Sequence, residues 1–546
     1  MHTIVRRGGT LLAASALSLA TLVAPTVPPA VAAEEHDAGP VTAGAGWLSG
    51  QLTDGLLSYP TDFGPFTDHG LSIDAALGLD AVGGHDATVR SISDAVGSDR
   101  EAYVTGEAFG DADSLYAGPA AKALVLAQTA GADPATYGGS DLVDRVESVV
   151  STDPVIAGRL EDRSSFGDYA NVLGQAFAAS GLTTAGSERA ADATAYLLQQ
   201  QCSEGFFRLD FTKDKTAVDQ TCDGGKGAGE SSPDTDATAL VILLLQDLGV
   251  APAIEESLAR AESWLLDQQG DDGSFGGGTS TEAPNTNSTG VAGWALGERG
   301  QVEAAEDAAA WVRGHQTVNV GVCAPWAEGA LGAIAYDDAA LDEGRGDGIT
   351  DGTVGQWLRA SAQALPVLQW APAVGSGGIL VVDYFDYFNR AGVNGGMWVS
   401  DRVPGETVCA AHRGIRVYRA VQRNGQAGFS LPLPDRTARR TYEVYGADGL
   451  LATKTFRTLG ELKIPFTLKK RVGKGAKQRL EVRGLERREQ VRVTFRGKLV
   501  ESRRVPKGGS FVVRFPVTGK VGKAKVKVIG HYPSLRRNAK TFKVTR

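Results

Sequence analysis

Cysteine, histidine and methionine are scarce in this chain, whose 546 residues include only 4 Cys, 7 His and 2 Met. The cysteine spacing fits no zinc site, and no histidine cluster completes one. Gly-x-Ser-x-Gly, P-loop and zincin motifs are also missing. The sequence therefore does not indicate a zinc enzyme, a P-loop enzyme or an α/β-hydrolase, and we expect neither a metal nor a cofactor.

Long apolar runs are scarce as well. The run at 11–24 follows two arginines and precedes Ala30-Val31-Ala32, which is the pattern of a secretory signal peptide. No second run downstream is long enough to cross a membrane. We therefore expect residues 1–32 to be removed by cleavage near Ala32, and the protein to be exported and then released or retained at the cell envelope.

Four cysteines in an exported protein predict disulfides. Cys202 and Cys222 bracket one loop between two expected helices, which favours a bridge between them over the two other connectivities. The remaining bridge would join Cys323 to Cys409 across a domain junction.

Acidic residues are rare in the tail of the chain. Residues 461–546 contain 26 Lys and Arg against 5 Glu, a net charge of +21, so the other 460 residues carry 29 minus 59, or −30. A basic tail predicts an anionic partner. For an exported protein an acidic envelope polymer or anionic lipid is nearer than nucleic acid, and the alternatives are a solvated face or docking on the acidic body.

Internal repeats dominate residues 43–370. Amphipathic helices are predicted about 50 residues apart, each followed by an apolar helix, with a last helix at 353–368. The amphipathic helices are expected near 46–57, 86–96, 141–150, 187–201, 253–269 and 302–315. The apolar helices are expected to open at Asp68-His-Gly, Tyr116-Ala-Gly, Tyr169-Ala-Asn, Asp234-Thr-Asp, Asn285-Thr-Asn and Trp326-Ala-Glu.

Six such hairpins predict an α/α toroid, because a ring of apolar helices inside a ring of amphipathic ones buries both flanks of every inner helix. Several outer helices end in Gln followed by a Gly turn and an aromatic, as in Gln269-Gly-Asp-Asp-Gly-Ser-Phe275. In this the chain resembles the squalene-cyclase and prenyltransferase repeat superfamily over 43–370. The resemblance implies a fold more than an activity, because that toroid serves cyclases, prenyltransferase subunits and cobalamin carriers.

From residue 371 onward the pattern changes to short alternating strands with Gly and Pro turns. Two segments overlay at an offset of 82–86 residues, so that Gly428–Pro434 matches Ser510–Pro516. We therefore expect two small β-sandwiches, at 371–460 and 461–546, similar to bacterial immunoglobulin-like modules. The predicted fold class is multidomain, with a helical toroid followed by two β domains.

The sharpest chemical motif is Asp234-Thr-Asp-Ala-Thr-Ala239. It resembles the D-x-D-D-T-A motif of class II terpene cyclases, which implies Asp236 as the proton donor and Asp234 as its neighbour, although Ala237 replaces the last acidic residue. A buried carboxylic acid is what that chemistry requires. The alternative is a helix cap, in which Asp234 caps the helix and Asp236 and Thr238 satisfy amides of its first turn. Asn285 and Asn287 are at the equivalent place one repeat later.

A binding role is the other alternative, because the openings of all inner helices should meet at one end of the toroid. A polar rim above an aliphatic cavity suits an amphipathic ligand. We expect an exported binding or adhesion protein, with a cyclase-like enzyme and a cobalamin or lipid carrier as alternatives. The rim residues expected in addition to Asp234 and Asp236 are Asp68, His69, Tyr116, Tyr169, Asn171, Asn285, Asn287, Trp326 and Glu328.

Overall fold

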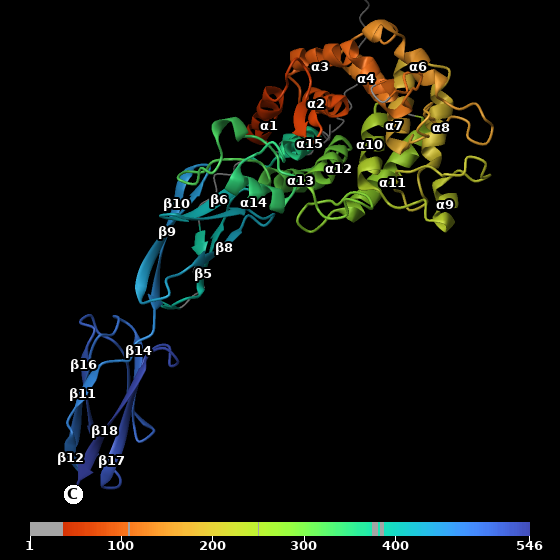
Figure 1. Ribbon diagram of the computed structural model, residues 1–546. Coiled ribbons are helices and arrows are strands. Elements are labelled where there is room, and N and C mark those ends of the chain that lie inside the picture. The colour runs from red at the N-terminus through yellow and green to blue at the C-terminus, as the bar shows by residue number, and fades with distance from the viewer. Residues whose placement is uncertain (1–35, 108–109, 249–250, 374–379, 383–386) are drawn as a thin grey trace, which may run out of the picture. The chain divides into compact units, whose positions relative to one another are not determined.

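A computed structural model describes residues 36–107, 110–248, 251–373, 380–382 and 387–546. Up to Trp370 the described chain is helical apart from one short hairpin, and from Leu380 onward it forms strands (Figure 1). The expected signal peptide lies outside the described residues. No helix among those residues has the length and apolar content that a membrane crossing requires.

Within the described residues, six helices form a closed inner ring in which each contacts the next and the last contacts the first. Each is rich in small apolar residues, so neighbouring backbones approach closely: a Cβ added to Gly290 would lie 2.4 Å from the Cα of Ala364. The ring members are α2 (His69–Val82), α5 (Ala117–Thr129), α7 (Val172–Ala185), α10 (Thr235–Leu245), α12 (Thr286–Glu298) and α15 (Val354–Ala364).

A second set of helices packs around the ring, and its members are more polar on their outer side. These outer helices are α1 (Ala38–Gly50), α3 (Asp86–Ser98), α6 (Leu142–Ser148), α8 (Ala190–Gln199), α11 (Pro252–Gln268) and α13 (Val302–Gly314). Shorter elements connect them: α4 (Arg100–Val104), α9 (Cys222–Gly225), α14 (Asp338–Asp347), the hairpin β1 (Ser58–Thr61) and β2 (Gly64–Thr67), and the 3-10 turns η2 (Tyr137–Gly139), η3 (Lys226–Ala228), η4 (Glu328–Ala330) and η5 (Pro366–Trp370). The predicted α/α toroid is confirmed.

A repeated hydrogen bond fixes the turn before four of the six inner helices. In these helices, the residue four positions after the capping residue has a polar side chain. Its oxygen accepts a hydrogen bond from the backbone amide at the end of the preceding turn. The pairs are Ser72 with Leu57 at 2.9 Å, Gln175 with Leu160 at 2.8 Å, Thr238 with Phe207 at 2.9 Å and Thr289 with Phe275 at 2.9 Å. The Gln, Gly and aromatic pattern marks this turn, because Gln269 also donates to the carbonyls of Gly273 and Ala304.

Two details of the predicted repeat were wrong. Trp326-Ala-Glu does not open an inner helix: it leads into the short turn η4, which begins at Glu328. The sixth ring member is α15, which was expected as an additional last helix. The first outer helix spans Ala38–Gly50 instead of 46–57, because the Asp37 side chain caps its start and residues 53–56 form a turn.

The strands form two sandwiches, each with its own core. In the first, the sheet β4-β10-β9-β6-β7 faces the sheet β3-β5-β8. Its strands are β3 (Leu380–Val382), β4 (Asn389–Arg390), β5 (Asn394–Ser400), β6 (Thr407–His412), β7 (Ile415–Ala420), β8 (Ala427–Pro432), β9 (Ala438–Gly446) and β10 (Gly449–Leu459).

In the second sandwich, the sheet β12-β18-β17-β14-β15 faces the sheet β11-β13-β16. Its strands are β11 (Phe466–Leu468), β12 (Arg471–Gly473), β13 (Lys477–Val482), β14 (Gln490–Phe495), β15 (Lys498–Arg504), β16 (Phe511–Pro516), β17 (Gly522–Ile529) and β18 (Arg537–Thr545).

The two sandwiches repeat one another in a buried glutamate, Glu406 in the first and Glu489 in the second. The carbonyl of each accepts an amide 2.9 Å away, from Val421 and Val505 respectively. Each carboxylate is paired with an arginine that is itself buried, Arg402 in the first case and Arg536 in the second. The overlay predicted from the sequence therefore extends to buried polar residues.

Both predicted disulfides are present. Cys202 is bonded to Cys222, and Cys323 is bonded to Cys409 of β6. The second bridge joins the helical part of the chain covalently to the first sandwich. Two disulfides are consistent with an oxidising environment.

Candidate functional site

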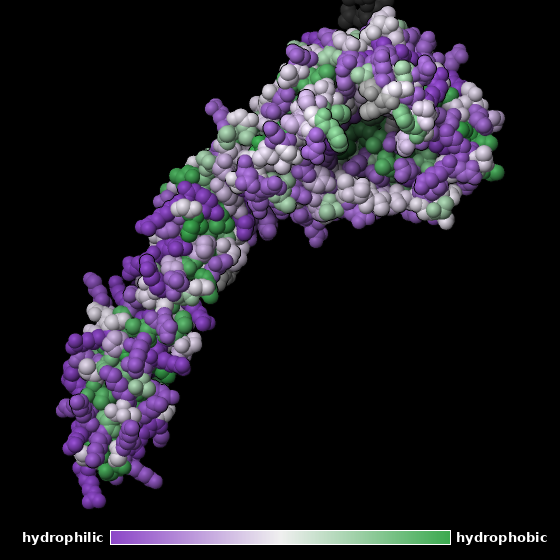
Figure 2. All heavy atoms as spheres, viewed as in Figure 1, coloured by the Kyte–Doolittle hydropathy of each residue, from purple (hydrophilic) through white to green (hydrophobic). Residues whose placement is uncertain are grey.

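The inner ring encloses a cavity of about 510 Å³ to which all six inner helices contribute. Figure 2 shows a hollow in the helical part with hydrophobic side chains inside it. Leucines and valines form most of the apolar wall, together with the rings of Phe177 and Trp294. A cavity of this size and lining is typical of a site for a small apolar or amphipathic molecule.

Carboxylates outnumber cations in the lining of the cavity. Among the described residues, five acidic side chains border it, whereas Lys122 is the one cationic side chain in its lining. Lys122 is already engaged, because its Nζ lies 2.5 Å from Oδ1 of Asp74 and donates to the carbonyl of Gly70 at 3.0 Å. The acidic lining residues are Asp74, Asp80, Asp236, Asp247 and Glu298.

One end of the cavity is formed by the C-terminal turns of inner helices, where Asp80, Asp247 and Glu298 lie. The carbonyl ends of helices carry partial negative charge, so cations usually occupy their last turns. No basic residue is present in the last turn of α2, α10 or α12. Burial raises the pKa of Asp80, and the nearby carboxylate of Asp86 raises it further.

Asp236 lies near the other end, in the first turn of α10. Its Oδ1 is buried and has no hydrogen-bond partner among the described residues. Burial raises the pKa of this carboxyl to about 6, the Ser288 hydroxyl opposes that rise, and the neighbouring Asp234 adds to it. Asp236 therefore exchanges a proton near neutral pH while lining an apolar cavity.

A glycine turn after α11 covers the two aspartates. A Cβ at Gly277 would lie 2.9 Å from Oδ2 of Asp236, and one at Gly278 would lie 2.1 Å from Oδ2 of Asp234. Real side chains do not approach that closely. Glycine is therefore required here for the turn to close over the carboxylates.

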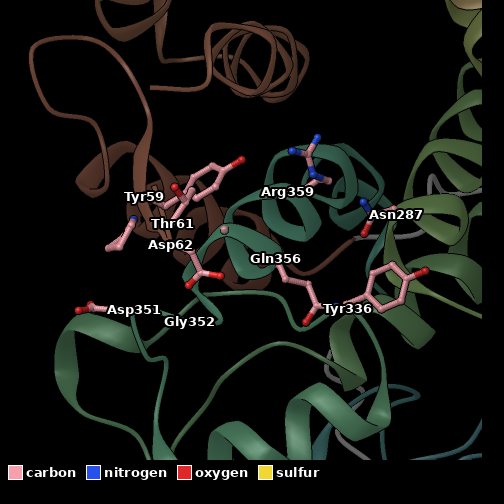
Figure 3. Close-up of a pocket in the computed structure, with 11 residues that line it drawn as sticks. Tyr59, Thr61, Asp62, Asn287, Tyr336, Asp351, Gly352, Gln356 and Arg359 are labelled. Atoms are coloured by element: carbon pink, nitrogen blue, oxygen red, sulfur yellow. The ribbon is translucent and has the colours of Figure 1, made fainter. Parts of the chain in front are cut away.

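A second cavity, of about 710 Å³, opens at the N-terminal ends of α12 and α15 (Figure 3). In the view of Figure 3, Arg359 lies between Tyr59 and Asn287. Arg359 is 3.1 Å from Oδ2 of Asp68, and the Tyr59 hydroxyl donates to the same oxygen at 3.1 Å. Burial raises the pKa of Tyr336 on the same wall, and the carboxylates of Asp337 and Asp236 raise it further.

A chain of polar side chains links this second cavity, which we call the mouth, to the cavity inside the ring. Asn287 donates from Nδ2 to Oε1 of Gln363 at 2.6 Å, and Gln363 donates from Nε2 to Oδ2 of Asp74 at 3.3 Å. Asp74 in turn pairs with Lys122. The Oδ1 of Asn287 is buried and has no partner among the described residues, so it can accept a hydrogen bond from a ligand.

Four of the predicted rim residues are helix caps. Asp68, Asn171, Asp234 and Asn285 each cap an inner helix and accept a backbone amide of its first turn. The capping interpretation of Asp234 and Asn285 is therefore confirmed, although the carboxyl of Asp236 takes no part in capping.

The other predicted rim residues are spread over several places. Asn287 lines the mouth, whereas Tyr116, Tyr169 and Asn171 line a cavity of about 360 Å³ that shares Lys122 and Phe177 with the inner cavity. The Nε2 of His69 lies 2.8 Å from Oδ2 of Asp99, and His69 lines none of these cavities. Two further predicted residues lie away from the rim: Trp326 is buried against Trp357, with ring centroids 5.7 Å apart, and Glu328 is exposed in η4.

Sequence reasoning missed Asp74, Lys122 and Gln363. Asp74, Lys122 and Phe177 each lie six residues after the N-cap residue of their helix. This shared offset brings them to the same level of the ring, and extending the comparison of helix openings by one turn would have revealed it.

The ligand atoms of Cys202, Glu204 and Asp223 lie within 4.8 Å of one another. Cys202 is bonded to Cys222, and Lys226 pairs with both carboxylates. This cluster is accounted for by a disulfide and ion pairs.

Comparison with known proteins does not assign the chain to a family. No family model matches the chain, and no curated protein matches it. Among solved structures, the type II terpene cyclase MstE from Scytonema has 13% identity and a TM-score of 0.41, over 61% of this chain and 97% of that one. An unsaturated glucuronyl hydrolase from Bacillus sp. GL1 has 12% identity and a TM-score of 0.39, over 61% of this chain and 98% of that one.

The strands have a counterpart as well. The adhesin InvE of Yersinia pseudotuberculosis has 12% identity and a TM-score of 0.17, over 32% of this chain and 60% of that one. Likenesses at this level carry no argument about activity, so the function must be argued from the cavities themselves.

Proposed function

We propose that this chain is an exported binding protein whose toroid holds an amphipathic small molecule. The observation that carries the proposal is the cavity of about 510 Å³, which has an apolar wall and polar groups at both ends. Burying an apolar chain against such a wall stabilises a complex by about 0.8 kcal/mol for each CH₂ group. The polar ends fix the orientation of a ligand with a polar head.

The charges favour a cationic head over an anionic one. Five carboxylates and one lysine line the cavity, and that lysine is paired with Asp74. The faces of Trp294 and Phe177 are also attractive to a cation. An anionic head would meet net repulsion and would have to compete with Asp74 for Lys122.

Native mass spectrometry of the oxidised protein tests this with three amphiphiles of equal chain length: dodecylamine, dodecyl maltoside and dodecanoate. Dodecylamine should bind most tightly and dodecanoate most weakly. Val291→Trp fills the cavity and should abolish binding, whereas Leu266→Trp on the exposed side of α11 should not.

A separate double variant tests the preference for a cationic head group. Asp80→Asn with Glu298→Gln should weaken dodecylamine about tenfold, since each lost attraction at a partly exposed site is worth about 0.5 to 1 kcal/mol. The matched pair Glu256→Gln and Asp267→Asn, exposed on α11, should leave its affinity unchanged. Binding of dodecanoate equal to that of dodecylamine would contradict the charge argument.

A second candidate function is proton-initiated cyclisation of an isoprenoid, with Asp236 as the acid. The specific observation in its favour is a carboxyl whose pKa is raised to about 6 by burial at an apolar cavity, with one oxygen free of partners. Incubation with squalene, 2,3-oxidosqualene and geranylgeranyl diphosphate should then give isomers of unchanged mass. Asp236→Asn should keep the fold and lose them, and an unmodified protein that converts none of the three would contradict the proposal.

A further inference from the structure

The strand β17 separates its side chains into two sets, as alternation along a strand requires. The positions facing the core carry buried alanine or valine, whereas the positions between them carry Lys523, Lys525 and Lys527, all exposed. Three lysines therefore stand on one outer face, about 6.6 to 6.8 Å apart along the strand.

The sheet register extends this row across neighbouring strands. Lys523 of β17 is directly opposite Lys543 of β18, which is directly opposite Arg471 of β12. Neighbouring strands are about 4.8 Å apart, so three cations lie side by side. Like charges directly opposite one another destabilise a sheet, and a bound anion would remove that cost.

The same face continues onto β14 and β15. Arg492 of β14 and Arg537 of β18 are both in register with Ile529 of β17. Arg504 of β15 is in register with Gln490, which lies two residues before Arg492 and so faces the same side. All are exposed, and none forms an ion pair within the described residues. We define the basic face by the outward cations of this sheet: Arg471, Arg492, Arg504, Lys523, Lys525, Lys527, Arg537 and Lys543.

The five glutamates of residues 461–546 lie elsewhere. Glu481 is on the facing sheet, where it forms ion pairs with Arg479 and Arg483. Glu489 is buried and paired with Arg536. Glu501 is in register with the buried Val493 and so belongs to the core side of β15. The last two, Glu461 and Glu486, precede strands β11 and β14. The positive charge of the basic face is therefore uncompensated.

The residues between the cations indicate the chemistry of a partner. On β17 and β18, the outward positions between the cations carry Thr541, Ala539 and the half-buried Ile529. Aromatic side chains, on which unpaired bases stack, do not occur among these positions. Apolar side chains on the face are few, the half-buried Ile529 and the exposed Leu499 of β15, whereas a membrane-bound surface inserts a set of large apolar anchors into lipid.

We propose that the basic face binds a linear anionic polymer, such as a polyphosphate or a poly(glycerol phosphate), through its repeating charges. A chain with a charge at every repeat can follow the row on β17 or cross the strands at Arg471, Lys543 and Lys523. The proposal is independent of the toroid cavity.

Binding of the full-length oxidised protein to long-chain inorganic polyphosphate, measured at several salt concentrations, tests it. Lys523→Gln, Lys525→Gln and Lys527→Gln together should weaken binding at least tenfold and reduce the slope of log affinity against log salt by about 3, one for each lost contact. The control carries three matched changes, Lys463→Gln, Lys477→Gln and Lys507→Gln, which remove exposed lysines outside the basic face. It should bind like the parent.

Hydrogen exchange of β17 and β18 establishes that both triple variants are folded. Equal loss of binding in the two variants would overturn the proposal, because net charge alone would then account for it. Retention by anionic lipid vesicles without retention by polyphosphate would also overturn it, in favour of a membrane surface.

Discussion

The hydroxyl of Thr238 accepts a hydrogen bond from the backbone amide of Phe207 at 2.9 Å, and it donates one to the carbonyl of Asp234 at 2.7 Å. Both residues of the first pair are buried. One side chain thus ties the inner helix α10 to the turn that follows the outer helix α8.

Replacing Thr238 with valine should destabilise the toroid by about 1 to 3 kcal/mol, because the Phe207 amide is left buried without an acceptor. Thr238→Ser keeps the hydroxyl and should cost less. Urea unfolding followed by tryptophan fluorescence measures this selectively, since seven of the eight tryptophans precede residue 371. A loss for serine equal to or greater than that for valine would contradict the prediction, because the methyl group would then matter at least as much as the hydroxyl.

Gly290→Ala should also destabilise the toroid, by about 1 to 3 kcal/mol, because its Cβ would lie 2.4 Å from the Cα of Ala364 and force α12 away from α15. Gly46→Ala is the matched control: it lies inside α1 with nothing within 4 Å of the added Cβ. Alanine is favoured in a helix interior by about 1 kcal/mol, so that variant should gain stability. Thermal unfolding of the two variants should therefore shift in opposite directions.

The protonation of Asp236 should make stability depend on pH. Its folded-state pKa is about 6, above the ordinary value of 3.8, so the folded protein holds this proton more tightly than the unfolded chain does. Stability should therefore fall as the pH rises from about 4 to 6 and level off above that, by at most about 3 kcal/mol. Asp236→Asn should lack this fall, and a carboxyl ¹³C titration of the parent should give a midpoint near 6. A midpoint near 4 would contradict the burial argument.

The same titration should govern the ligand. Because Asp236 becomes negatively charged as the pH rises through about 6, the affinity for dodecylamine should increase over that range, while the affinity for uncharged dodecyl maltoside should not. Calorimetric titrations at pH 5 and pH 7 compare the two. Parallel changes for both amphiphiles would place the head group away from Asp236.

Glu489→Gln should unfold or strongly destabilise the second sandwich, by about 3 to 5 kcal/mol, because Arg536 would remain charged and buried without its carboxylate. Arg536 donates to Glu489 through Nε at 2.7 Å and Nη2 at 3.0 Å. Glu481→Gln removes a carboxylate from exposed arginines and should change little. Hydrogen exchange in β14 and β17 reports on this sandwich separately from the toroid.

The sequence predicted the toroid because its signals are local and repeated. Asp68, Asn171, Asp234 and Asn285 are capping residues that can be recognised one helix at a time, and the glycine turns recur at similar spacing. The sixth repeat broke the pattern, because η4 and α14 separate α13 from its inner partner α15. Trp326 was therefore taken for a helix opening, although it is a core residue beside Trp357.

The candidate site was only half predictable. Asp236 stood out because it follows a capping aspartate in a recognisable motif. Lys122 shares its offset from the helix start with Asp74, but its ion pair with Asp74 and the link through Gln363 appear only when α2, α5 and α15 are neighbours in the ring. Contacts between helices that are far apart along the chain leave no spacing to read.

The sequence by itself determined the order of most helices and strands and the separation of charge between an acidic body and a basic tail, because composition and periodicity along one stretch of chain carry that information. It favoured the observed disulfide pairs over two other connectivities. Only the tertiary structure decided which polar side chains share a cavity and which cations share a face. Closing the ring placed Asp74 and Lys122 beside Gln363, and strand register placed Lys523 beside Lys543. Both depend on which distant segments pair, and that choice is made by burial of the whole core.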